Sequence, residues 1–265
     1  MLRLDPLFVR SPPPAEPKGA RSAGPIRVRG SASPTEYKVR TITGDEFDVI
    51  YTRSSTTVKA CLSCFRHMFK NSDDEWVAGL DVEYTTVLGL EKDLKDEERK
   101  NPAVIQVCVH DLCLIYHICH ADIECLDFKD FRESNLVKFV IVDFGNDKEV
   151  LGRIGLIVGN PFDLQKNRLL PFGGQPSMLT LAGAMVHPSY GKLEKPHYTF
   201  HHHAWQQNVL DIDHYHYAAM DGYLCFNIYK GWMKSKSQVC GSSKEVSAKR
   251  KRDKDKVEDV DEDSE

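Results

Sequence analysis

The chain has 265 residues, of which 41% are hydrophobic and 28% are charged, and its formal net charge is −4. This length and apolar content suit one sizeable folded domain with tails. The near-neutral charge excludes binding to nucleic acid through overall basicity, although a local basic rim would suffice to hold one end of a strand. The sequence contains no apolar run long enough to span a membrane, so we expect no membrane partner.

The two ends of the chain differ in composition from its middle. Residues 1–34 are rich in Pro, Arg, Ser and Gly and predict a disordered segment, with an organellar transit peptide as the weaker alternative. Residues 236–265 contain a basic run, Lys249 to Arg252, followed by an acidic stretch, and predict a disordered charged tail. The basic run is a candidate nuclear address or phosphate-binding patch, and a plain solvated segment explains it equally well. The folded domain is expected over residues 35–235.

The eight cysteines show no spacing typical of a secreted disulfide framework, and we see no signal-peptide hydrophobic region. We therefore expect reduced thiols and a location in the nucleus, the cytoplasm or both. Cys61 and Cys64 form a lone C-x-x-C pair in a predicted helix over residues 55–69. A zinc ribbon needs a second pair, so buried core thiols are the better interpretation. The three histidines from His201 to His203 likewise favour a polar loop over a metal site.

Strand-like runs dominate the first half of the folded part. Residues 36–42 and 46–51 favour a hairpin around the turn at Gly44. Residues 103–109 and 113–117 favour a second hairpin with a tight turn between them. Together with a strand that begins at Trp76, the second hairpin would form the antiparallel start of a mixed sheet.

Asp81 and Glu83 lie at the end of that third strand, after the apolar run 76–80. Side chains two residues apart on a strand share a face, so the two carboxylates point the same way. They would repel each other and raise a pKa unless a cation neutralised them. A polar strand end that faces water explains an isolated Asp-x-Glu triplet about as well.

A further acidic residue, Asp147, follows a predicted strand over residues 137–142 and stands at the entrance to a predicted helix over 147–154. Taken alone, it is better explained as an N-cap or first-turn acid that the helix dipole stabilises. Asp143 is the nearby alternative for any metal-binding role.

The most strongly predicted helix covers residues 212–233 and carries Tyr217 and Asp221. These residues are four apart and therefore lie on one helical face. An acid buried near the middle of a helix needs a charge partner, because an unpaired buried carboxylate is costly. A cation shared with Asp81 and Glu83 would be such a partner, and a solvent-facing Asp is the alternative.

The chain contains four segments whose order resembles the 3′–5′ exonuclease superfamily with a ribonuclease H-like fold: GLDVEYT, NPAVIQVCVHDLCLIYHI, DFGNDKEVL and HYAAMDGYLCFNIY. The Tyr-x-x-x-Asp form of the last segment resembles the DEDDy branch. The likeness is greatest to exonuclease domains of the Werner-syndrome-protein type, including their stand-alone plant relatives, and it covers Glu36 to Lys234. It implies an α/β fold, with a ribonuclease H-like mixed β-sheet flanked by α-helices.

By this resemblance, two divalent cations, Mg²⁺ or Mn²⁺, would be held by four carboxylates: Asp81, Glu83, Asp147 and Asp221. Hard oxygen ligands of this kind suit both ions. Tyr217 would position the attacking water. The implied activity is metal-dependent 3′–5′ exonuclease action, which releases nucleoside monophosphates from a DNA or RNA 3′ end.

The resemblance also has departures and alternatives. Gly222 stands where relatives often carry Ala, and the stretch His187 to Trp205, with its three histidines, is unusual. The chain holds no helicase motor, so any unwinding would come from a separate helicase. The alternative functions are an inactive nucleic-acid-binding or interaction module with the same fold, and a phosphohydrolase that acts on small nucleotides.

Overall fold

The computed structural model describes residues 34–72, 74–85, 100–153, 155–167, 175–193 and 202–258. The N-terminal segment predicted to be disordered, apart from its last residue, lies outside these ranges. A seven-stranded sheet forms the centre of the molecule, in the order β1-β2-β5-β4-β3-β6-β7. The strands are β1 (Thr35–Arg40), β2 (Glu46–Thr52), β3 (Val77–Thr85), β4 (Asn101–Val109), β5 (Leu112–Tyr116), β6 (Lys138–Ile141) and β7 (Pro161–Asp163).

The sheet is mixed. Strands β1 and β2 form an antiparallel hairpin whose turn contains Gly44 at φ +91°, as the sequence predicts. Strand β4 is antiparallel to both of its neighbours, β3 and β5, which confirms the predicted second hairpin and its pairing with the strand of Asp81. The parallel pairs are β2 with β5, β3 with β6, and β6 with β7.

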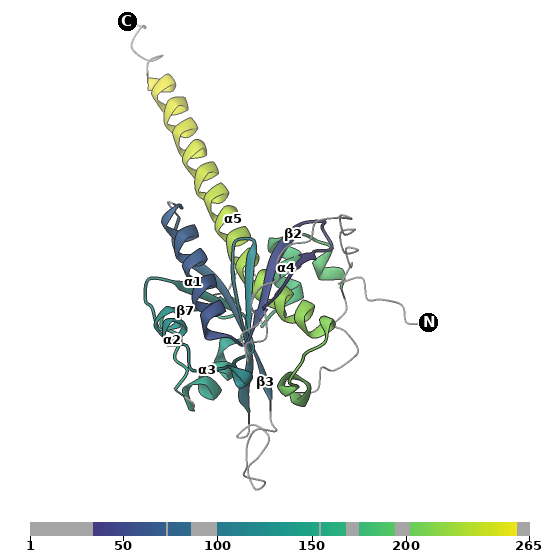
Figure 1. The fold of residues 1–265 in the computed structure, drawn as a ribbon. Coiled ribbons are helices and arrows are strands. Elements are labelled where there is room, and N and C mark those ends of the chain that lie inside the picture. The colour runs from purple at the N-terminus through teal and green to yellow at the C-terminus, as the bar shows by residue number, and fades with distance from the viewer. Residues whose placement is uncertain are drawn as a thin grey trace, which may run out of the picture.

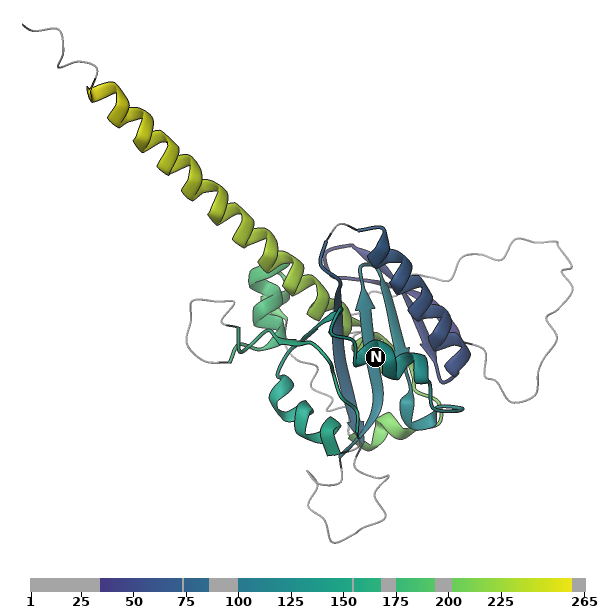
Figure 2. The same ribbon diagram turned by 90° about the vertical axis from the view of Figure 1, so that its left-hand side faces the viewer.

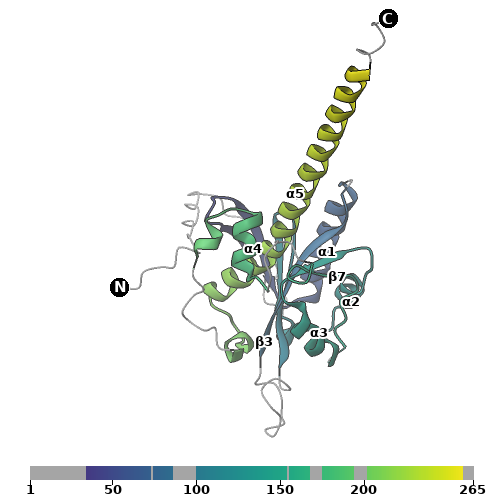
Figure 3. The ribbon, with the colours of Figure 1, turned by 180° about the vertical axis from the view of Figure 1, so that it is seen from behind.

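Helices cover both faces of the sheet (Figure 1). The helices are α1 (Ser55–Lys70), α2 (Leu126–Arg132), α3 (Phe144–Arg153), α4 (Met178–Met185) and α5 (Ile212–Glu258), with short 3₁₀ helices η1 (Ile118–His120), η2 (Tyr190–Lys192) and η3 (His202–Gln206). One apolar core lies between the sheet and α1, α2 and α3, and includes Leu62, Leu80 and Phe128. The other lies between the sheet and α4 and α5, and includes Val104 and Leu224. The view from behind shows the same two layers (Figure 3).

Two predicted helices have different bounds in the structure. Helix α3 begins at Phe144 rather than at Asp147, which places Asp147 inside its first turn. The residue before the helix, Asp143, has φ +60°, a left-handed conformation that Asp tolerates better than most residues. Helix α5 does not end near Met233 but continues as helical backbone to Glu258, through most of the segment for which the sequence predicts disorder (Figure 2). No proline follows residue 196, and good helix formers are frequent in this stretch.

The predicted helix that carries the C-x-x-C pair is α1. Cys61 is buried there, but Cys64 is exposed, so the expectation of two buried thiols is wrong for Cys64. All cysteines with described side chains are free thiols. The described part of the His201 to His203 run belongs to η3 rather than to an irregular loop. Among the described helices, none combines the length and apolar character needed to cross a membrane.

Candidate metal centre

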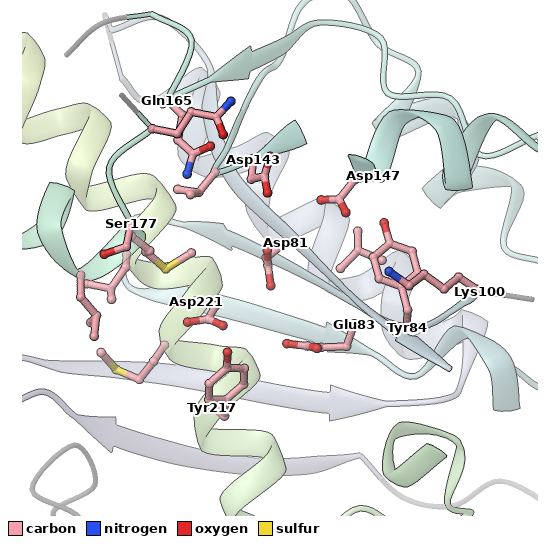
Figure 4. Close-up of a pocket in the computed structure, with 17 residues that line it drawn as sticks. Asp81, Glu83, Tyr84, Lys100, Asp143, Asp147, Gln165, Ser177, Tyr217 and Asp221 are labelled. Atoms are coloured by element: carbon pink, nitrogen blue, oxygen red, sulfur yellow. The ribbon is translucent and has the colours of Figure 1, made fainter. Parts of the chain in front are cut away.

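A cavity of about 530 Å³ opens beside the end of β3, between this strand and helices α3, α4 and α5. All five residues singled out in the sequence line this cavity (Figure 4): Asp81, Glu83, Asp147, Tyr217 and Asp221. Each of them is half-buried. The structure therefore brings every predicted site residue to one place.

Three of the acids point toward one another from strand β3 and helix α5. Asp81 and Glu83 share the face of β3 that α5 covers, and Asp221 points from α5 toward them (Figure 4). One carboxylate oxygen from each of these three residues lies within 4.8 Å of the other two. Asp147 stands apart from this group, on the first turn of α3, at the far side of Asp81 from Asp221 (Figure 4).

The cluster disfavours its own negative charge. Burial, and then the charges of Asp221 and Asp147, raise the pKa of Asp81 well above its ordinary value. Burial and the neighbouring carboxylates, Asp81 first, act in the same way on the pKa of Glu83. Burial also raises the pKa of Asp147 to about 6, although the hydroxyl of Tyr84 opposes this shift. Acids gathered in this way are stabilised in their charged form by a bound cation.

The donor set fits a hard divalent cation. The three clustered ligand atoms are carboxylate oxygens, which Mg²⁺ and Mn²⁺ prefer. The cluster contains neither thiolate nor imidazole ligands, which would favour softer metals. Asp81, Glu83 and Asp221 would hold a cation directly, and Asp147 extends the acidic surface for a second.

The hydroxyl of Tyr217 points at the acidic cluster. Tyr217 lies one helical turn before Asp221 on α5, and its hydroxyl is directed toward the Asp221 and Glu83 carboxylates (Figure 4). The charge of Asp221, together with burial, raises the pKa of Tyr217 far above its usual range. The phenol therefore keeps its proton and can orient a water molecule without acting as a base.

Trp205 packs against Tyr217, and the buried side chain of His117 in turn holds the Trp205 backbone in place. The Trp205 ring of η3 packs on the Tyr217 ring, with 6.2 Å between the centroids. The Trp205 carbonyl oxygen lies 2.9 Å from Nε2 of His117, and the Tyr51 hydroxyl lies 2.6 Å from Nδ1 of the same ring. Burial lowers the pKa of His117 to about 4, so the ring is neutral. Its Nε2–H then donates to Trp205 while Nδ1 accepts from Tyr51.

Several cavity residues were not identified from the sequence: Tyr84, Lys100, Gln165 and Ser177 (Figure 4). Strict alternation puts Tyr84 on the strand face opposite Asp81, so the pattern gave no reason to choose it. Lys100 immediately precedes β4 and has no motif around it. Asp143, the alternative to Asp147, also lines the cavity, so position alone does not separate the two.

The chain shares its fold with solved structures of exonucleases. No protein-family model matches the sequence, and no curated protein is similar to it in sequence. RNase D of Trypanosoma brucei, solved in complex with RNA, is similar with a TM-score of 0.52 and 13% identity, over 69% of this chain and 62% of that one. RNase D of Escherichia coli, an exoribonuclease involved in structured RNA processing, gives a TM-score of 0.52 and 15% identity, over 71% of this chain and 45% of that one.

These similarities define the class of fold. The mixed seven-stranded sheet with helices on both faces is the α/β fold of ribonuclease H-like exonuclease domains, which confirms the predicted fold class. The chain spans less than two thirds of the length of either RNase D structure. At 13–15% identity the likeness concerns the fold alone, so the chemistry must be argued from the cavity itself.

Proposed function

We propose that this protein is a metal-dependent 3′–5′ exonuclease of the DEDDy type, which hydrolyses phosphodiester bonds at polynucleotide 3′ ends and releases nucleoside monophosphates. The observation that carries the proposal is the convergence of Asp81, Glu83 and Asp221 within 4.8 Å. The fold shared with the RNase D structures supports it. We also propose that, among such enzymes, the protein is most similar to exonuclease domains of the Werner type, on the basis of its four ordered sequence motifs.

The residues of the cavity would have different roles in hydrolysis. Two divalent cations, when bound, would supply the positive charge that activates a water and stabilises the charge developing on the phosphate. Asp81, Glu83, Asp147 and Asp221 would hold them. The Tyr217 hydroxyl would orient the attacking water, since a positioned group of this kind lowers the entropic cost of reaction.

The remaining walls of the cavity suit the end of a nucleic-acid strand. The Lys100 ammonium would contact a substrate phosphate, and Met178 and Leu179 offer an apolar surface to a base or sugar. A volume of about 530 Å³ lies in the range of small-molecule pockets, which favours one terminal nucleotide over a duplex segment. A terminal nucleotide at the acids is the geometry that exonuclease action requires.

The proposal is tested by following 5′-labelled single-stranded DNA and RNA oligonucleotides with Mg²⁺ or Mn²⁺, beside free nucleotides. We expect products shortened stepwise from the 3′ end, together with nucleoside monophosphates. A blocked 3′ terminus should protect the substrate. Asp221→Asn, purified in the same way, controls for contaminating nucleases.

The two alternatives give different outcomes in the same assay. An inactive binding module would retain the oligonucleotide without shortening it. A small-nucleotide phosphohydrolase would consume the free nucleotides and leave the oligonucleotides intact. Either result would contradict the proposed function.

A further inference from the structure

The ring of Tyr84 lies in the hydrophobic core, and its hydroxyl lies at the wall of the cavity. Its side chain is only 8% exposed, and its ring packs in the core between the sheet and α1, α2 and α3. The residue nevertheless lines the same cavity as the acids, with its hydroxyl directed at the Asp147 carboxylate (Figure 4). It is therefore a second tyrosine in the cavity, across from Tyr217.

Tyr84 reaches the cavity from the sheet face on which α3 packs. The register between β3 and β4 shifts between Glu83 and Tyr84: Glu83 pairs with Val104, whereas Tyr84 pairs with Pro102. The extra residue is Ala103, so the bulge lies in β4, and bulges are frequent beside active sites. Tyr84 stays on the face of β3 that Leu80 and Val82 share, and α3, which carries Asp147, packs on that same face.

The buried hydroxyl of Tyr84 lowers the stability of the metal-free fold. It approaches Asp147 without reaching standard hydrogen-bond geometry and has no other hydrogen-bond partner among the described residues. A buried hydroxyl that lacks a partner costs free energy, and a Phe ring would fill the same core space without this cost. The Asp147 carboxylate is the neighbouring acceptor that could become its partner.

Asp147 lies outside the cluster of three acids, so its orientation depends on other contacts. Asp81, Glu83 and Asp221 converge on one point where they would share a cation, whereas Asp147 stands outside that group on α3. Carboxylates that bind metals are normally held by further hydrogen bonds, and losing such a bond typically lowers metal affinity about 10–100-fold. Tyr84 is the hydroxyl directed at Asp147 within the described cavity.

We propose that Tyr84 is a positioning residue for Asp147: its hydroxyl donates a hydrogen bond to the Asp147 carboxylate in the metal-loaded protein and so sets the affinity of the cation site that depends on Asp147. This inference rests on the proposed function only in assigning cations to the four acids. Cation binding is measured without any turnover, so the two proposals fail separately.

The test is titration of the full chain with Mn²⁺, followed by electron paramagnetic resonance, in wild type and Tyr84→Phe. We expect two classes of site in wild type. In Tyr84→Phe the weaker class should lose about 10-fold or more in affinity while the tighter class is unchanged. If the protein digests oligonucleotides, the variant should need more Mn²⁺ but reach the wild-type rate at saturation.

Two further variants separate positioning from packing. Tyr116→Phe removes the hydroxyl of another tyrosine of the same core, 2% exposed and away from the cavity, and should leave both Mn²⁺ affinities unchanged. Asp147→Asn should weaken the same class of site as Tyr84→Phe, and the double variant should lose little more than Asp147→Asn alone, because the two act through one carboxylate.

Unchanged Mn²⁺ affinities in Tyr84→Phe would overturn the inference, as would fully additive losses in the double variant. Wild-type protein that binds no Mn²⁺ would overturn it together with the metal assignment. Wild-type protein that binds Mn²⁺ as expected but digests no polynucleotide would refute the exonuclease proposal. The role of Tyr84 would then still be decided by the Mn²⁺ affinities of wild type and Tyr84→Phe.

Discussion

Gly79 of β3 and Gly222 of α5 touch backbone to backbone: a Cβ atom on Gly79 would lie 2.3 Å from the Gly222 carbonyl oxygen and 2.6 Å from the Phe226 nitrogen. This close approach fixes how near α5 comes to the sheet. Asp221 precedes Gly222 and Asp81 follows Gly79 by two residues, so the contact also sets the distance between the acids. Gly222 itself packs closely on β4, where a Cβ at position 222 would lie 3.2 Å from the Gln106 Cβ.

Gly79→Ala should therefore destabilise the fold by about 1–3 kcal/mol or more, because the added methyl meets backbone atoms that have no alternative rotamer. The matched control is Gly152→Ala on α3, where a Cβ meets nothing within 4 Å and Ala is the better helix former. The control should be as stable as wild type or more stable. Urea unfolding of the three proteins measures the difference, and equal midpoints for wild type and Gly79→Ala would show that α5 is not held at this contact.

Tyr217→Phe tests the positioning of the attacking water. The variant keeps the ring packing against Trp205, so its stability should change by only about 1 kcal/mol, the usual net value of a hydrogen bond. The single-turnover rate should fall on the order of 100-fold or more. Mn²⁺ affinity should survive, because all four carboxylates remain. A normal rate would mean that only the ring matters.

Asp143 and Asp147 are separated by a paired substitution. Asp147→Asn should weaken Mn²⁺ binding and slow digestion strongly, whereas Asp143→Asn should have a much smaller effect on both. Asp143 is exposed and has a left-handed backbone conformation just before α3. Asp147 is half-buried in the first turn of that helix. The comparison uses both assays on one preparation of each variant. The reverse order would assign the metal-binding role to Asp143.

The raised pKa of Asp147 predicts how stability depends on pH. Burial raises this pKa from 3.8 to about 6, so between these values the folded metal-free protein binds more protons than the unfolded chain. The free energy of unfolding should therefore fall as pH rises through this interval. In Asp147→Asn this part of the decline should be missing. Thermal unfolding in the presence of a chelator measures both curves, and identical slopes would contradict the assignment.

Cation binding should show the opposite dependence on pH. A cation must displace the proton from each carboxylate that it binds, so Mn²⁺ affinity should rise as pH increases through about 6. The raised pKa values of Asp81 and Glu83 act in the same direction.

Short-range periodicity made the centre of the site predictable. A strand period of two aligns Asp81 with Glu83, and a helix period of 3.6 aligns Tyr217 with Asp221, so each pair follows from sequence spacing alone. The meeting of the two pairs did not follow from spacing. It depended on the resemblance of four ordered motifs, and the structure then placed all three clustered acids within 4.8 Å of one another.

Features that depend on tertiary structure do not follow from the sequence. Tyr84 lies on the face that alternation predicts, and it reaches the cavity because α3, with Asp147, packs on that face; no local pattern shows which helix lies there. The contact between Gly79 and Gly222 joins residues that are far apart in the chain, so the sequence shows Gly222 only as a costly residue within a helix. The high charge of residues 236–265 predicts disorder, whereas the helix propensity of the same residues agrees with the observed length of α5.

The most direct measurement of the central claim is the rate at which Asp81→Ala and Asp221→Ala shorten a 5′-labelled oligonucleotide at saturating Mg²⁺, beside wild type. If the clustered carboxylates hold the cations that drive hydrolysis, both variants should lose digestion entirely. Each should remain folded, and the metal-free variants should be as stable as wild type or slightly more stable, because repulsion between the clustered acids is relieved. Digestion by either variant at close to the wild-type rate would contradict the account.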